Sequence, residues 1–164
     1  MVAGLLGFLD VTPAVDALRS AGIAFTIHEY AHDPAATSFG LEAATVLGLD
    51  PDQVFKTLLV TADGDQAVGI VPVSSMLSLK AIGAVLGRKR VEMCDPAVAQ
   101  RVTGYVLGGI SPFGQRKLLP TVIDETCELY DTVYVSGGRR GLDLGVAPTD
   151  LITLLSATVA DIVA

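Results

Sequence analysis

Two apolar stretches joined by a short polar turn constrain the fold of this chain more than any other feature. Residues 55–61 form one largely apolar run, and residues 66–73 form a second. Between them, Ala62-Asp63-Gly64-Asp65 contains the Asp-Gly pair that is typical of a tight hairpin turn. The sequence therefore predicts two buried, antiparallel strands that lie side by side, with the other elements packed around them.

Lys56 is the single charged residue within the first of these strands, and it stands near the start of that strand. Asp50-Pro51 just before it predicts a short helix, because Asp is a good N-cap residue and Pro suits the first helical turn. A lysine in this position either extends to solvent along its aliphatic stem or faces a charged ligand. The stretch alone leaves both interpretations open.

The rest of the chain alternates short helices with strands, which indicates the α+β class. Helix start signals such as Thr12-Pro13 and stop signals such as Gly87 delimit the elements. We predict helices over residues 13–21, 39–47, 79–86, 96–102 and 148–155, and further strands over 23–30, 91–93, 121–124, 132–135 and 142–146. The polar residues 136–141 predict a tight turn, and residues 158–163 form either a final strand or the end of a helix. We expect one domain over residues 12–164, built on a curved, mostly antiparallel, barrel-like mixed sheet, with residues 1–11 as an N-terminal extension.

Composition argues against several classes of protein. No apolar run approaches the roughly 18 residues of a membrane span, and residues 1–9 lack the features of a signal peptide. The net charge of −7 argues against a protein that coats DNA or RNA in general. Basic clusters at 88–90, 116–117 and 139–140 are either solvated turns or local patches for a phosphate backbone. Cys94 and Cys127 form no CxxC pair, so we expect reduced thiols in a cytoplasmic protein.

The long irregular stretch 103–120 is the best candidate for a functional loop. Its glycines, which include Gly108 and Gly109, let backbone N–H groups approach an anion or a polarised carbonyl. The alternative is that they only allow the chain to turn. The pattern is neither a GxGxxG motif after a strand nor a Walker loop, so we expect no nucleotide cofactor.

Asp143 and two histidines are the remaining candidates for chemistry. Asp143 lies between Leu142 and Leu144, and a carboxylate there either faces outward or has a partner. His28 and His32 are four residues apart, but Asp33-Pro34 interrupts the helix that would align them, so we expect no metal site. No Ser-His-Asp arrangement or activated cysteine supplies a nucleophile.

Taken in order, the motifs of this chain resemble those of one family. The matching segments are Thr12-Pro13-Ala14, Ile27-His28, Tyr30, His32-Asp33-Pro34, Phe39-Gly40, 49–54, Lys56-Thr57-Leu58, 91–93, 95–96, 98–101, 103–105, 108–112, 119–121, 134–138 and 140–143. The series is similar to the YbaK/EbsC branch of the trans-editing aminoacyl-tRNA deacylases, relatives of the editing domain inserted in bacterial prolyl-tRNA synthetases. Residues 1–11, the short hairpin turn and Ala31 depart from the family pattern.

The resemblance implies a YbaK-like domain over residues 12–164 that hydrolyses the ester between a wrong amino acid and the 3′ end of tRNA. The implied substrate is Cys-tRNA(Pro), and the implied partners are this mischarged tRNA and prolyl-tRNA synthetase. Lys56 matches the lysine that the family needs for activity, and Gly108 and Asp143 match further catalytic positions. The implied substrate-binding residues are Tyr30, Phe39, Thr57, Gly109, Ile110, Ser111 and Ser136.

In the family mechanism no enzyme side chain attacks the ester. The thiol of the substrate cysteine attacks the carbonyl and leaves as a thiolactone, which fits the lack of a nucleophile motif here. Asp143 would then bind the α-amino group of the substrate or pair with Lys56. Two alternatives remain open: a deacylase for alanine or another small residue, or a non-catalytic module that binds a small molecule or a partner. No cofactor and no metal are implied.

Overall fold

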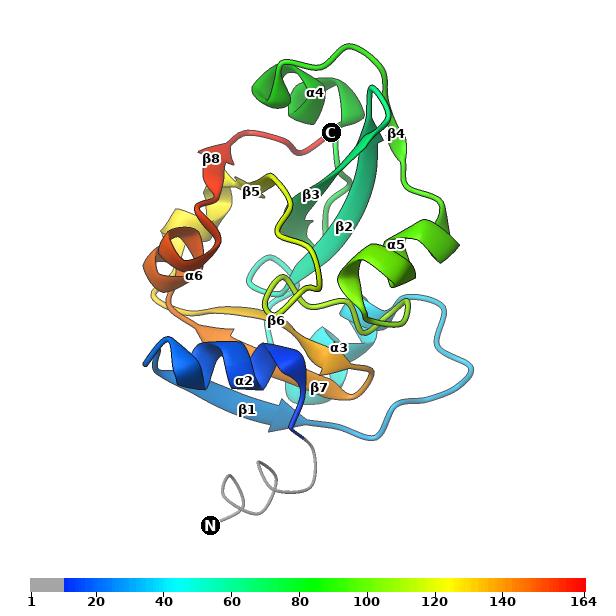
Figure 1. The fold of residues 1–164 in the computed structure, drawn as a ribbon. Helices are drawn as coiled ribbons and strands as arrows, with labels where there is room; N and C mark the ends of the chain where they lie inside the picture. The colour runs from blue at the N-terminus through cyan, green and yellow to red at the C-terminus, as the bar shows by residue number, and fades with distance from the viewer. Residues whose placement is uncertain (1–10) are drawn as a thin grey trace.

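The predicted hairpin forms the centre of the larger of two sheets in the computed structural model, which describes residues 11–164 (Figure 1). Strands β2 (Phe55–Ala62) and β3 (Asp65–Pro72) pair antiparallel along their whole length. Asp63 and Gly64 form the two-residue turn with φ angles of 48° and 89°. Such a turn needs positive φ at both positions, which explains the Asp-Gly pair.

Three further strands complete this five-stranded sheet, in the order β4-β2-β3-β5-β8. Strand β4 (Val91–Met93) pairs antiparallel with β2, whereas β5 (Thr121–Asp124) and β8 (Thr158–Ala160) extend the sheet in parallel beyond β3. The parallel pairs result from the long connections before β5 and β8, because parallel neighbours require a crossover.

The second sheet has three antiparallel strands in the order β1-β7-β6. They are β1 (Phe25–Glu29), β6 (Val133–Arg139) and β7 (Leu142–Val146). The two sheets meet just before β2, where Val54 and Tyr134 form an isolated β-bridge. The Tyr134 N–H donates to the Gln53 carbonyl (3.1 Å), and Gln53 Nε2 donates to the Thr132 carbonyl (2.8 Å). We call this contact the seam.

The helices cover the two sheets and lie where the sequence predicts them (Figure 1). Their bounds are α2 (Pro13–Ser20), α3 (Phe39–Leu47), α4 (Leu79–Leu86), α5 (Pro96–Thr103) and α6 (Pro148–Leu155), with a 3-10 helix η1 (Glu125–Leu129) that was not predicted. None of the helices in the described part of the chain is long and apolar enough to cross a membrane.

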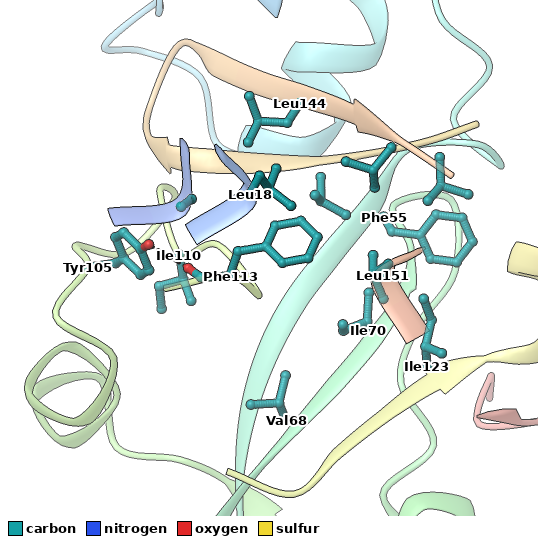
Figure 2. Close-up of a cluster of buried hydrophobic side chains, with 14 of the residues drawn as sticks. Leu18, Phe55, Val68, Ile70, Tyr105, Ile110, Phe113, Ile123, Leu144 and Leu151 are labelled. Atoms are coloured by element: carbon teal, nitrogen blue, oxygen red, sulfur yellow. Dashed lines mark hydrogen bonds between the residues drawn. The ribbon is translucent and has the colours of Figure 1, made fainter. Parts of the chain in front are cut away.

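The main hydrophobic core lies between the two sheets. Figure 2 shows Leu18 of α2, Leu144 of β7 and Phe113 of the irregular stretch 103–120. These side chains pack toward Phe55 and Ile70 of the hairpin. Alternate residues of the same strands, such as Val60 and Val71, face the other side of the large sheet and pack with Ile82 of α4. This alternation buries both faces of the hairpin, which explains its nearly continuous apolar sequence.

The predicted α+β class and the mostly antiparallel pairing are confirmed, and two details differ. The strands are divided between two sheets, so those of the described residues do not close into a barrel. Asp50-Pro51 opens a single turn, closed by the Gln53 N–H on the Asp50 carbonyl (2.9 Å), because the chain enters β2 directly afterwards and leaves no room for a helix.

The polar stretch 136–141, predicted to be a tight turn, belongs mostly to β6. The strand continues to Arg139 through an irregularity between Ser136 and Arg139, and only Arg140-Gly141 turns the chain into β7. Gly138 has a φ of 106°, which accommodates this bulge. The predicted N-terminal extension, residues 1–11, lies outside the described residues except for its last residue.

Candidate active site

A cavity of about 320 Å³ opens beside the seam, at the start of β2. Its walls come from β2, the N-terminal end of α3, the loop at 107–110 and the second sheet. Eight of the ten predicted site residues line it: Tyr30, Phe39, Lys56, Thr57, Gly108, Ile110, Ser136 and Asp143. Residues that lie up to 113 positions apart in the sequence, Tyr30 and Asp143, therefore share one pocket.

Gly109 and Ser111 are the two predicted site residues that the structure does not bring to the cavity. The Gly109 N–H donates to the Val106 carbonyl (3.0 Å), and a Cβ at this position would lie only 2.8 Å from the Cα of Arg139. Ser111 is fully buried, and its Oγ accepts a hydrogen bond from the Phe113 N–H (3.2 Å). Both residues support the loop from behind the cavity wall.

Asp143 is a buried carboxylate that has no partner within residues 11–164. It lies on β7 between His28 of β1 and Ser136 of β6, and it is 6% exposed. Within the described residues its side chain makes no hydrogen bond or ion pair, and the predicted alternative of a Lys56–Asp143 pair is not formed. Burial raises the pKa of Asp143 to about 7. Such a group suits a ligand that brings its own positive charge.

The positive side of the cavity is formed by Lys56 on β2 and by the N-terminal end of α3. Lys56 is half-buried on β2, and this burial lowers its pKa. Ser38 is the N-cap residue of α3 but makes no side-chain capping bond, so the first N–H groups of the helix remain open beside the cavity. Thr57 Oγ1 is buried and has no hydrogen-bond partner among the residues that the structure describes. The cavity thus combines a positive wall with one buried carboxylate and an unsatisfied hydroxyl.

The Gly108 loop is held in place by Arg140, which belongs to the matching segment 140–143 but was not among the predicted site residues. Arg140 Nε donates to the Leu107 carbonyl (2.9 Å), and its guanidinium lies 4.6 Å from the centre of the Phe39 ring. Gly108 has a φ of 81°, and a Cβ there would approach the Phe39 ring to 2.7 Å. Among the described residues, the N–H groups of Gly108 and Ile110 have no hydrogen-bond acceptor, and both residues line the cavity.

Cys94 lines the cavity, although it falls between the matching segments 91–93 and 95–96 and was not among the predicted site residues. It directly follows β4, and its N–H donates to the Leu59 carbonyl (3.0 Å), which brings it beside β2. No local signal predicts this pairing, because β2 and β4 are about 30 residues apart in sequence. Thr37, Ser38 and Gly40 also line the cavity, and their position beside Phe39 at a predicted helix start was the available signal.

The two histidines are held by different neighbours. His28 Nε2 lies 2.8 Å from Thr26 Oγ1, and His32 Nδ1 lies 2.8 Å from Glu42 Oε1. Glu42 also accepts the Asp33 N–H (2.6 Å), so this pair ties the chain after β1 to helix α3. The His32 ring is tilted against that of Phe39, with 5.6 Å between centroids, and thereby supports one wall of the cavity.

Fold and cavity together define a small α+β domain whose main cavity lies between a lysine and a buried carboxylate. The chain belongs to the aminoacyl-tRNA editing domain family, because the model of that family matches residues 32–154. This confirms the predicted membership of the trans-editing deacylases.

Individual relatives agree with this assignment. The Enterococcus faecalis protein named "Putative Cys-tRNA(Pro)/Cys-tRNA(Cys) deacylase EbsC" is 33% identical over 120 residues, which are 73% of each chain. A proline–tRNA ligase of Geobacter metallireducens is 30% identical over 101 residues, or 62% of this chain and 17% of the ligase. A crystal structure described as a "putative trans-editing enzyme for prolyl tRNA synthetase" matches with a TM-score of 0.82 and 26% identity, over 93% of this chain and 95% of that one.

Proposed function

We propose that this protein hydrolyses the aminoacyl ester of mischarged tRNA, with Cys-tRNA(Pro) as its substrate. The observation that carries the proposal is the cavity that holds Lys56 and the unpartnered, buried Asp143. Its volume of about 320 Å³ suits an aminoacyl group with part of the terminal adenosine. The similarity to EbsC supports the choice of cysteine and of proline tRNA.

Each group in the cavity has a role in this proposal. The Asp143 carboxylate binds the α-ammonium group of the aminoacyl ester, which supplies the positive charge that the buried carboxylate lacks in the free protein. Lys56 binds the terminal ribose or phosphate and fixes the ester in place. The N–H groups of Gly108 and Ile110 are the candidate donors to the carbonyl oxygen as it becomes an oxyanion.

The reaction itself uses the thiol of the substrate. The sulfur attacks the ester carbonyl carbon, the bond from that carbon to the ribose oxygen breaks, and the proton of the thiol ends on the ribose hydroxyl. Water then opens the released thiolactone to free cysteine. Because Cys94 is a protein thiol in the same cavity, it is the rival nucleophile. Substrate assistance requires that Cys94→Ser retain most of the deacylase activity.

The deciding experiment is a deacylation assay with cysteine, alanine and serine on proline tRNA. Wild-type protein is expected to release cysteine fastest, and Lys56→Ala is expected to abolish release. Lys117→Ala removes an exposed lysine that does not line the cavity, so it should leave the rate unchanged. Full activity of Lys56→Ala would remove Lys56 from the mechanism. Preferential release of alanine would change the substrate and keep the reaction, and no release from any charged tRNA would contradict the proposed function.

Prolyl-tRNA synthetase is the proposed partner. The match covers only 17% of the ligase, so this chain resembles one part of that enzyme. As a separate protein, it would act on tRNA released from the synthetase active site. Adding the synthetase to the assay is expected to increase the preference for proline tRNA over cysteine tRNA. A lower preference after the addition would speak against the partnership.

A further inference from the structure

A second groove, remote from Lys56, lies between α4 and β4. Its volume is about 310 Å³, and it is lined by Leu79, Lys80, Gly83, Ala84, Arg88, Lys89 and Val91. Three of these seven side chains are cationic, and Lys80, Arg88 and Lys89 are all exposed. Residues 80–90 contain four basic residues and no acidic one, in a chain whose net charge is −7. The local excess of positive charge is therefore not a consequence of overall composition.

The backbone around this groove is firmly fixed. A Cβ at Gly83 would lie 2.9 Å from Cγ2 of Val91, so the glycine allows α4 to lie directly against β4. After the helix ends at Leu86, with Gly87 as its C-cap, the Arg88 N–H donates to the Gly83 carbonyl (2.9 Å). The Asp63 carboxylate then accepts the N–H groups of Lys89 (3.1 Å) and Arg90 (2.9 Å). The basic residues are thus presented from a structured turn.

Nearby carboxylates neutralise the groove only in part. Asp65 pairs with Arg88 (3.0 Å), but the Asp65 side chain is 72% exposed, so this ion pair contributes little. Asp63 is engaged by backbone N–H groups, and Glu92 on β4 is a further exposed acid. Within the described residues, neither Lys80 nor Lys89 has a carboxylate within ion-pair distance, which leaves both ammonium groups available.

Strands β2 and β4 connect this groove to the active-site cavity. Lys56 lies near the start of β2, and Ala62 at its other end is paired with Val91, which lines the groove. The six residues from Lys56 to Ala62 span about 20 Å. On β4, Cys94 lines the cavity and Val91, three residues earlier, lines the groove. A stacked nucleic-acid strand rises about 3.4 Å per nucleotide, so about six nucleotides cover the distance.

We propose that the groove of Lys80, Arg88 and Lys89 binds the sugar-phosphate backbone of the tRNA acceptor stem while the aminoacylated 3′ end occupies the cavity. The inference rests on the proposed function, because it takes the occupant of the cavity to be an aminoacyl-tRNA. The distance between the cavity and the groove agrees with this placement. The last few nucleotides of a tRNA are single-stranded, so a contact about six nucleotides from the ester falls on the first base pairs of the stem.

The test compares two substrates of different length in the variant Lys89→Glu. One is full-length Cys-tRNA(Pro), and the other is the cysteinyl ester of the trinucleotide CCA, which is too short to reach the groove. For Lys89→Glu we expect kcat/KM on the full-length substrate to fall about tenfold, with no change on the trinucleotide ester. Arg19→Glu reverses an exposed charge on α2 and should leave both rates unchanged.

A binding measurement separates this inference from the proposed function. Affinity for uncharged proline tRNA is measured by fluorescence anisotropy over a range of salt concentrations. In Lys89→Glu, the slope of log affinity against log salt should fall by about one, as expected when one phosphate contact is lost. The proposed role of the groove is overturned if wild type and Lys89→Glu show equal affinities and equal salt slopes. It is also overturned if kcat/KM of Lys89→Glu falls equally on both substrates. If wild type hydrolyses neither ester, the proposed function fails while the anisotropy result still decides whether the groove binds RNA.

Discussion

Asp143 is deeply buried and has no partner in the described part of the chain, which affects how stability depends on pH. Its pKa is about 7 in the folded protein and ordinarily 3.8, so the folded state binds a proton more tightly than the unfolded state. The free energy of unfolding therefore falls as the pH rises from about 4 to about 7, by at most about 4 kcal/mol. Under the proposed function, this cost is offset when the carboxylate binds the α-ammonium group of the substrate.

The matching prediction concerns Asp143→Asn. The amide does not ionise, so the variant should be more stable than wild type at pH 8, and the difference in melting temperature should shrink toward pH 4. The Asp143→Asn variant should also lack deacylase activity throughout this pH range. Thermal denaturation of both proteins between pH 4 and 8 is the measurement, and melting temperatures that change in parallel would contradict the buried, unpaired state of the carboxylate.

Gly108 is required by backbone conformation and by space. Alanine would adopt a left-handed conformation at a cost of about 1–2 kcal/mol and would press its Cβ against Phe39. We expect Gly108→Ala to lower the deacylation rate by about 10²–10³, because the loop N–H groups move away from the ester. Gly64→Ala is the matched control, since Gly64 also has positive φ but a Cβ there meets open space. An equal loss of activity in both variants would attribute the effect to stability alone.

Arg140 acts through the loop that it holds. Arg140→Ala removes the bond to the Leu107 carbonyl and the contact with Phe39, so we expect kcat to fall about tenfold with little change in melting temperature. Arg140→Lys should not restore the rate, because an ammonium group cannot reproduce both contacts in one plane. Steady-state kinetics with Arg19→Ala as the exposed control tests this, and an unchanged kcat in Arg140→Ala would exclude the role.

Among the elements, helix α2 is hydrogen-bonded to the second sheet through the side chain of Thr12, in addition to its apolar packing. Thr12 Oγ1 accepts the Val15 N–H (3.2 Å) as the N-cap and donates to the Gly137 carbonyl of β6 (2.5 Å), and the residue is buried. Thr12→Ala removes both bonds and should lower the free energy of unfolding by about 1–3 kcal/mol. Thr12→Ser keeps the hydroxyl and should lose much less. Denaturant unfolding measures both, and equal losses would show that the methyl group matters more than the hydroxyl.

Local signals account for most of the elements. Turn chemistry at Asp63-Gly64, helix starts at Thr12-Pro13 and Asp95-Pro96, and glycine stops each act within a few residues, so the sequence alone placed the hairpin and the five helices. Two local predictions were wrong for an equally local reason. The helix expected at Pro51 is cut short by the immediate start of β2, and the turn expected at 136–141 is shortened by the bulge in β6.

At the level of the whole molecule, the predictable part of the site is the part that the family motifs carry. Lys56, Gly108 and Asp143 were named from those motifs, and the structure brings them to one cavity. The separation into two sheets, the presence of Cys94 in the cavity and the contacts of Arg140 all depend on pairings between distant segments. No short stretch of sequence encodes them, so they become visible only in three dimensions.

Under the proposed function, the seam between the sheets makes deacylase activity a measure of complete folding. Lys56 and Thr57 come from one sheet and Ser136 and Asp143 from the other, so a partly folded chain with only one sheet formed has no active site. Deacylation should therefore disappear at the same denaturant concentration as the circular dichroism of the whole chain, provided that unfolding has a single step. Variants that weaken only the hydrogen bond between Gln53 and Thr132 would separate the activity curve from the circular dichroism curve. Loss of deacylation would then report that the two sheets are no longer correctly joined.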